Sequence, residues 1–131
     1  MNFQQFIIIG RVGRDAEMRY TPNGQAVTSF SVAVSENYTK DGEKVKSTVW
    51  IRVTAWGKLA EVCNQYIKKG KLVQCIGKLK GDTAGNPRIF NKQDGTPSAS
   101  FEMTANSVLF LSKDDAQTSE AVQIVDEELP F

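Results

Sequence analysis

Apolar and polar side chains alternate along the first part of the chain in short segments separated by turn residues. Residues 3–12 and 26–35 are rich in β-branched side chains and are bounded by Gly, Pro or Asn, as strands usually are. In the second segment Phe30, Val32 and Val34 alternate with Ser and Ala, which directs one face to a core and the other to water. The pattern predicts two strands, and a Pro-Asn-Gly turn lies between them.

A third strand is expected at residues 47–56, after a polar loop at residues 38–47 that contains an Asp-Gly turn. The apolar period then changes. Between residues 58 and 70 the apolar positions recur at i, i+3, i+4, i+7 and i+8, which predicts an amphipathic helix packed on a core. Gly70 suits the left-handed position just after the end of this helix.

Residues 71–81 and 99–111 are predicted as the fourth and fifth strands, joined by a long polar hairpin loop. Five strands with one helix between the third and the fourth are the order of the OB fold, a small and partly open Greek-key barrel. We therefore predict an all-β OB-fold domain over residues 1–111, although other small barrels share this pattern. The following residues are poor in apolar side chains, so a short disordered linker over residues 112–125 is expected before an acidic tip at residues 126–131.

The net charge of +1 hides an asymmetry between the two parts of the chain. Residues 1–111 carry 15 Lys and Arg against 9 Asp and Glu, a net charge of +6. Residues 112–131 carry one Lys against 6 Asp and Glu, a net charge of −5. Such a division is typical of a protein whose basic body binds a polyanion and which carries an acidic tail. The alternative is a solvated tail that only aids solubility.

The stretch TVWIRVTAWGK, residues 48–58, has an unusual composition on one face. Strand alternation places Val49, Ile51, Val53 and Ala55 on a core face and Trp50, Arg52, Thr54 and Trp56 on the other. Two indoles beside a guanidinium are what single-stranded nucleic acid requires, because any base can stack on a flat ring and a cation can contact its phosphate. Alternatively, one indole lies in the core and the other covers the helix.

Further aromatic side chains occur among basic residues of the predicted loops, and they extend this candidate surface. Together with the strand residues they make the predicted DNA-binding set: Tyr38, Lys46, Trp50, Arg52, Trp56, Arg88, Phe90 and Lys92. A track of rings and cations of this kind binds a single strand without reading its sequence.

The sequence gives little support to catalysis or to a bound cofactor. It contains no His, which removes the commonest general base, and neither Cys63 nor Cys75 has the spacing of metal ligands. Asp15 and Glu17 are flanked by arginines and are interpreted as part of a solvated, locally paired loop. We expect no catalytic residue, no metal and no cofactor. No apolar run or basic leader points to a membrane or to secretion, so a cytoplasmic protein is expected.

Three stretches of the chain resemble bacterial single-stranded DNA-binding proteins (SSB): GRVGRDAEMRYTPNG, TVWIRVTAWGKLAEVCNQYIKKG and the terminal DEELPF. The resemblance implies an OB fold, a homotetramer that wraps single-stranded DNA, and a location at the nucleoid. It places Tyr38, Trp50, Trp56 and Phe90 at the positions of the aromatic residues on which that family stacks DNA bases. It also implies that the tip docks onto replication, recombination and repair enzymes through Asp126, Glu127, Glu128, Leu129, Pro130 and Phe131.

The sequence therefore predicts a non-catalytic protein that coats single-stranded DNA and recruits partner enzymes through its tip. A second hypothesis for the tail is that it competes with DNA for the basic body. The alternative function is an OB-fold RNA-binding or primosome-type adaptor that uses the same aromatic face. A protein-only interaction module, with Trp50 and Trp56 in a protein interface, is a third reading.

Overall fold

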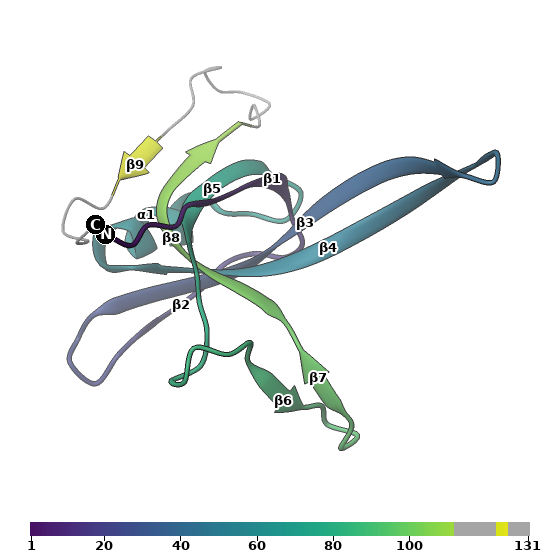
Figure 1. Ribbon diagram of the computed structural model, residues 1–131. Helices are drawn as coiled ribbons and strands as arrows, with labels where there is room; N and C mark the ends of the chain where they lie inside the picture. Colours follow the sequence, from purple (N-terminus) through teal and green to yellow (C-terminus); the bar gives the residue numbers. More distant parts are fainter. Residues whose placement is uncertain (112–122, 126–131) are drawn as a thin grey trace.

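The computed structural model describes residues 1–111 and the short strand at residues 123–125 (Figure 1). The elements in chain order are β1 (Phe6–Val12), β2 (Glu17–Tyr20), β3 (Ala26–Lys40), β4 (Glu43–Trp56), α1 (Gly57–Tyr66), β5 (Leu72–Leu79), β6 (Ile89–Asn91), β7 (Pro97–Ala99), β8 (Phe101–Phe110) and β9 (Gln123–Val125). In the described part of the chain, no helix is both long and apolar enough to cross a membrane.

Five of these strands close into a barrel in the order β1, β5, β8, β4, β3. The barrel closes where Arg11 and Val12 of β1 pair with Ala33 and Val32 of β3. β4 and β8 run parallel, and the other pairings between described strands are antiparallel. With α1 between the third and fourth barrel strands, this is the OB-fold topology, and the predicted fold is confirmed.

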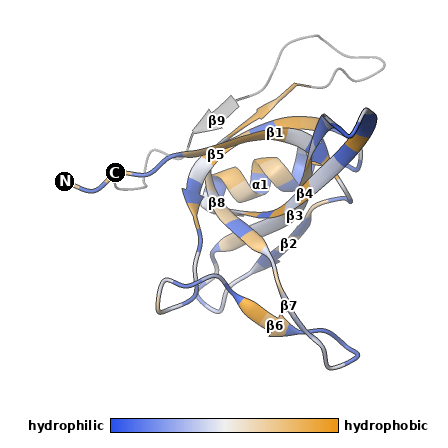
Figure 2. Ribbon diagram, turned by 45° about the vertical axis from the view of Figure 1, so that its right-hand side comes forward, coloured by the Kyte–Doolittle hydropathy of each residue, from blue (hydrophilic) through white to orange (hydrophobic). Residues whose placement is uncertain are grey.

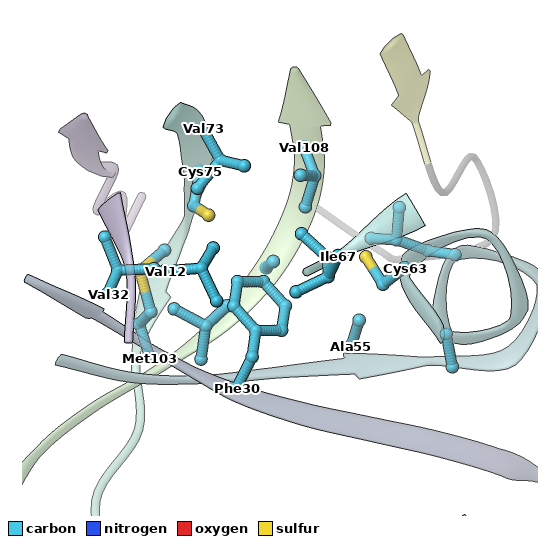
Figure 3. Packing of buried hydrophobic residues seen from close by; sticks show 14 of the residues in the cluster. Val12, Phe30, Val32, Ala55, Cys63, Ile67, Val73, Cys75, Met103 and Val108 are labelled. Atoms are coloured by element: carbon cyan, nitrogen blue, oxygen red, sulfur yellow. The ribbon is translucent and has the colours of Figure 1, made fainter. Parts of the chain in front are cut away.

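The core lies inside the barrel and under α1 (Figure 3). Alternation in β3 and β4 directs Phe30, Val32 and Val53 inward, and the helix adds Leu59 and Cys63. The helix is also joined to the barrel by a buried hydrogen bond, in which the hydroxyl of Thr28 donates to the carbonyl of Ala60 at 2.6 Å. The predicted amphipathic stripe therefore packs on the core at Leu59 and Cys63, whereas Tyr66 of the same stripe is 43% exposed.

β3 and β4 continue beyond the barrel as a two-stranded arm, where the sequence predicted a polar loop (Figure 1). Asp41 and Gly42 have φ of 53° and 80°, so the two-residue turn matches the twist of the flanking strands and lets their pairing continue to Lys40 and Glu43. The core position expected for Val49 is wrong, since its side chain is 42% exposed. β8 pairs with β4 only from Ile51 to Thr54, and no other strand of the described part of the chain pairs with β4 in the arm, apart from β3.

Three other local predictions differ from the structure. The helix ends at Tyr66, and Ile67 turns inward with extended dihedral angles, so Gly70 takes its positive φ of 90° in the following turn. The segment expected as a loop around Glu17 forms β2, which pairs with β3. The long polar loop before β8 contains the small hairpin of β6 and β7.

The predicted linker and tip fall mostly outside the described residues, which exclude 112–122 and 126–131. Residues 123–125 are an exception, because β9 pairs with β8 antiparallel where the sequence predicted an unstructured linker. The positions directly opposite one another are Gln123 and Leu109, Ile124 and Val108, and Val125 and Ser107.

Candidate nucleic-acid interface

Trp50 and Arg52 lie on the outer face of β4 because Ile51 and Val53, which alternate with them, point into the core. Their neighbours across β3 are small, with Ala33 opposite Trp50 and Ser31 opposite Arg52. The indole of Trp50 is 54% exposed. It is therefore a surface ring supported by a rigid sheet, and the core alternative is excluded for this residue.

Gly13 forms part of the support beneath the indole of Trp50. A Cβ atom at residue 13 would lie 2.5 Å from Cζ3 and 2.9 Å from Cη2 of the ring, which is much closer than van der Waals contact. The absence of a side chain at residue 13 is thus required for the observed ring position. Nothing in the local sequence pattern indicated this role, because the contact joins the end of β1 to the middle of β4.

Trp50, Arg52, Arg88 and Phe90 line one hollow of about 230 Å³ together with Ser31 and Ser100. β4 supplies Trp50 and Arg52. Phe90 comes from β6, and Arg88 from the segment just before it. Figure 2 shows hydrophobic residues on β6, the strand that supplies Phe90. The structure thus brings together four of the residues predicted from the sequence, and Ser31 and Ser100 were missed.

Arg88 has contacts that fix its guanidinium beside this hollow. Its central carbon lies 6.0 Å from the centroid of the Phe90 ring, within the range of a cation–π interaction. Its Nη1 lies 3.6 Å from Oε1 of Glu102, whose side chain is only 3% exposed. The parallel register also places Arg52 opposite Glu102. A buried carboxylate thus forms an ion pair with Arg88 and orients this side chain, whose outer surface stays open to solvent.

Tyr38 and Lys46 lie away from this hollow, in the arm. Together with Asn37, Thr39, Lys44 and Val45 they line a separate hollow of about 400 Å³. Tyr38 is opposite Val45, so strand alternation places it on the other side of the arm from Trp50. The hydrophilic tip of the arm is visible in Figure 2.

Trp56 and Lys92 do not join the two hollows. Trp56 is the last residue of β4, lies opposite Val27 and is partly buried at the start of α1. Lys92 is in the turn of the β6–β7 hairpin, where its backbone N–H donates to the carbonyl of Thr96 at 2.8 Å. The continuous aromatic track predicted from the sequence is therefore divided in the structure into a central hollow and peripheral residues.

A third hollow of about 220 Å³ lies next to Arg52 and brings in Arg14, which the sequence analysis did not select. Asp15 and Glu17 also line it. Asp15 accepts a hydrogen bond from the backbone N–H of Lys69 at 2.9 Å, so this carboxylate ties the loop after β1 to the turn after α1.

The two cysteines lie in the core and take no part in these hollows (Figure 3). Burial raises the pKa of the Cys63 thiol to about 12. Burial also raises the pKa of Cys75, and the charge of a nearby Cys63 thiolate raises it further. Among residues 1–111, no three His, Cys, Asp or Glu side chains come together as a metal-binding group would.

Residues 3–111, which contain the whole barrel and all three hollows, match the single-strand binding protein family. The chain belongs to this family. The single-stranded DNA-binding proteins of Neisseria meningitidis serogroup A and serogroup B are each 40% identical to it over 112 residues. These alignments cover 85% of this chain and 61% of the relatives, so the chain spans less than two thirds of their length.

A further relative supports the same assignment, and a solved structure supports the fold. Single-stranded DNA-binding protein 1 of Chlorobaculum tepidum is 44% identical over 75 residues, covering 56% of this chain and 46% of its own. The solved structure of Plasmodium falciparum SSB in complex with ssDNA has a TM-score of 0.69 at 22% identity, covering 86% of this chain and 97% of the other. This likeness shows the fold alone.

Proposed function

We propose that this protein binds single-stranded DNA without sequence preference. The proposed surface consists of the outer face of β4, the arm formed by β3 and β4, and the β6–β7 hairpin. The observation that supports this most directly is the central hollow, where an exposed indole, a phenyl ring and two guanidinium groups surround one space. Membership of the single-strand binding protein family supports the same function.

The chemistry of the central hollow suits a splayed-out strand. Trp50 and Phe90 offer ring faces on which bases stack, at about 1–3 kcal/mol per base. Arg52 and Arg88 offer charge to the phosphates between those bases, and each neutralised phosphate releases counterions. Lys46 would extend the path along the Trp50 face of the arm, Tyr38 would meet a strand that passes around the arm to its other face, and Lys92 and Trp56 would lie at the margins.

The proposed role is to coat and protect single-stranded DNA during replication, recombination and repair, in the cytoplasm and at the nucleoid. It is a binding role without catalysis. The chain contains no His, and neither of its two buried cysteines lines any of the three hollows.

A homotetramer is the proposed assembly. Ile7 and Ile9 alternate with the core residues of β1, so they lie on the outside of the barrel, where each is about half exposed. Ile76 of β5 lies opposite Ile7 on the same outer face. A strip of isoleucines on a rigid sheet favours burial against another subunit.

The acidic tip is proposed to recruit partner enzymes. Asp126, Glu127 and Glu128 would steer it to basic patches, and Phe131 with its α-carboxylate would enter a pocket, next to Leu129 and Pro130.

The binding proposal is tested by anisotropy of a labelled oligo-dT with the Trp50→Ala and Phe90→Ala variants. Each change is expected to weaken binding by about 1–3 kcal/mol, roughly 5- to 150-fold. Tyr20→Ala is the matched control, because Tyr20 is a 61% exposed ring on β2 that lines none of the three hollows. Equal affinity of all three variants and the unaltered protein would argue against stacking in this hollow.

Competition with an RNA of the same sequence separates DNA binding from the alternative, an RNA-binding or primosome-type adaptor. Preference for DNA supports the proposal, and preference for RNA supports the alternative.

A further inference from the structure

One edge of β8 changes its neighbour part-way along the strand. β5 pairs with β8 from Met103 to Phe110. On the opposite edge β4 pairs with β8 only up to Thr104, because β4 then ends at Trp56 and the chain enters α1. The position that β4 leaves is taken by β9, whose residues pair with residues 107–109 of β8.

This position has the features of a strand-docking site. A strand edge presents backbone donors and acceptors to any extended segment that reaches it, which is the basis of β-strand addition. Here the edge is bounded by the end of β4 on one side and by α1, which contacts both β8 and β9. The space therefore admits a short strand rather than a further sheet, and the observed occupant is three residues long.

We propose that residues 107–109 of β8 form a docking site for an extended strand, that its occupant is Gln123–Val125 of the same chain, and that docking holds the acidic tip beside the barrel. The 11 residues from 112 to 122 join two positions on adjacent strands, so the chain reaches the site readily. The inference does not depend on the proposed DNA binding.

Docking changes the reach of the tip. A free linker of 14 residues, 112–125, would let the tip move over a distance on the order of 20 Å from the end of β8. With β9 docked, the tip begins directly after Val125. Figure 1 shows β9 on the side of the barrel away from the arm and the β6–β7 hairpin. Docking therefore anchors the chain at Val125, directly before the tip carboxylates, and limits the length of free chain that could carry them to the cations of the central hollow.

The direct test is a disulfide between residues 109 and 123, made with the Leu109→Cys and Gln123→Cys changes in the full chain. Directly opposite residues of an antiparallel pair have Cβ atoms close to the separation that a disulfide needs. The control pair combines Leu109→Cys with Gln117→Cys. The native thiols of Cys63 and Cys75 are buried and do not interfere.

Docking predicts that the 109–123 pair oxidises at least ten times faster than the control pair and gives a cross-link within one chain on a non-reducing gel. Equal rates for both pairs would overturn the docking site. Disulfide-linked dimers would show that residues 123–125 of a second copy, and not those of the same chain, pair with residues 107–109 of β8. The rate should not change with saturating oligo-dT, and slowing by oligo-dT would contradict a site remote from the central hollow.

Hydrogen exchange on the unaltered protein keeps the inference testable if the Leu109→Cys change disturbs folding. The amides of residues 123–125 that point toward β8 should exchange at least ten times more slowly than those of residues 116–120. Uniform fast exchange over residues 116–125 would refute docking.

Discussion

The contact between Gly13 and Trp50 gives a sharp prediction, because a single methyl group at residue 13 should move the ring on which a base stacks. In Gly13→Ala the new Cβ would lie 2.5 Å from Cζ3 of Trp50. Carbon atoms in contact are usually about 3.5–4.0 Å apart, so the indole must move by about 1 Å. The backbone of Gly13 lies outside the left-handed region, so alanine itself causes no strain there.

A displacement of this size disturbs stacking without removing the ring. We expect a loss of about 1 kcal/mol in oligo-dT binding, roughly five-fold, against about 1–3 kcal/mol for Trp50→Ala. The free energy of unfolding should change by less than about 1 kcal/mol, since the ring is exposed and can move outward. Anisotropy titrations and denaturant unfolding measure the two quantities on the same samples.

A double-mutant cycle supplies the control for this prediction. Once Trp50→Ala has removed the ring, Gly13→Ala has nothing to displace and should leave affinity unchanged. If Gly13→Ala reduces affinity equally with and without the indole, the effect does not pass through the Trp50 ring and the reasoning is refuted.

Three further predictions concern charge, the thiols and the tail. Arg52→Gln should reduce the slope of log K against log salt by about 0.7, whereas an unchanged slope would show that Arg52 meets no phosphate. Iodoacetamide at pH 8 should leave Cys63 and Cys75 unmodified in the native protein and modify both in denaturant, because burial raises the pKa of Cys63 from 9.0 to about 12. For the same reason stability should fall as the pH rises above about 9, where only the unfolded chain loses these protons. Removing Phe131, or adding one residue after it, should abolish capture of partner enzymes while oligo-dT affinity stays the same, and equal capture by the extended chain would contradict recognition of the terminus.

The strand pattern was sufficient to predict the barrel and the central residues of the site. Alternation in β4 placed Ile51 and Val53 inside and Trp50 and Arg52 outside, and the structure agrees. The same pattern failed at Val49, because alternation gives the face of a residue but does not indicate where the barrel ends and the arm begins. It also failed at Thr54, which was predicted on the outer face but is only 5% exposed.

The remaining features depend on contacts between distant parts of the chain. Gly13 supports Trp50 only because β1 and β4 lie in one closed barrel. Tyr38 was grouped with Trp50 by composition, whereas the register of the arm separates them. The pairing of β9 with β8 was not predicted, since three residues of strand in an otherwise polar segment give no periodic signal.

The central claim is that a DNA base stacks on Trp50, and the fluorescence of a single-tryptophan variant tests it most directly. In Trp56→Phe the remaining indole emission comes from Trp50, and in Trp50→Phe it comes from Trp56. Titration with oligo-dT should strongly quench the emission of the Trp56→Phe variant and have a much smaller effect on Trp50→Phe, whose partly buried indole lies outside the central hollow. Saturable DNA binding without quenching in the Trp56→Phe variant would contradict the account.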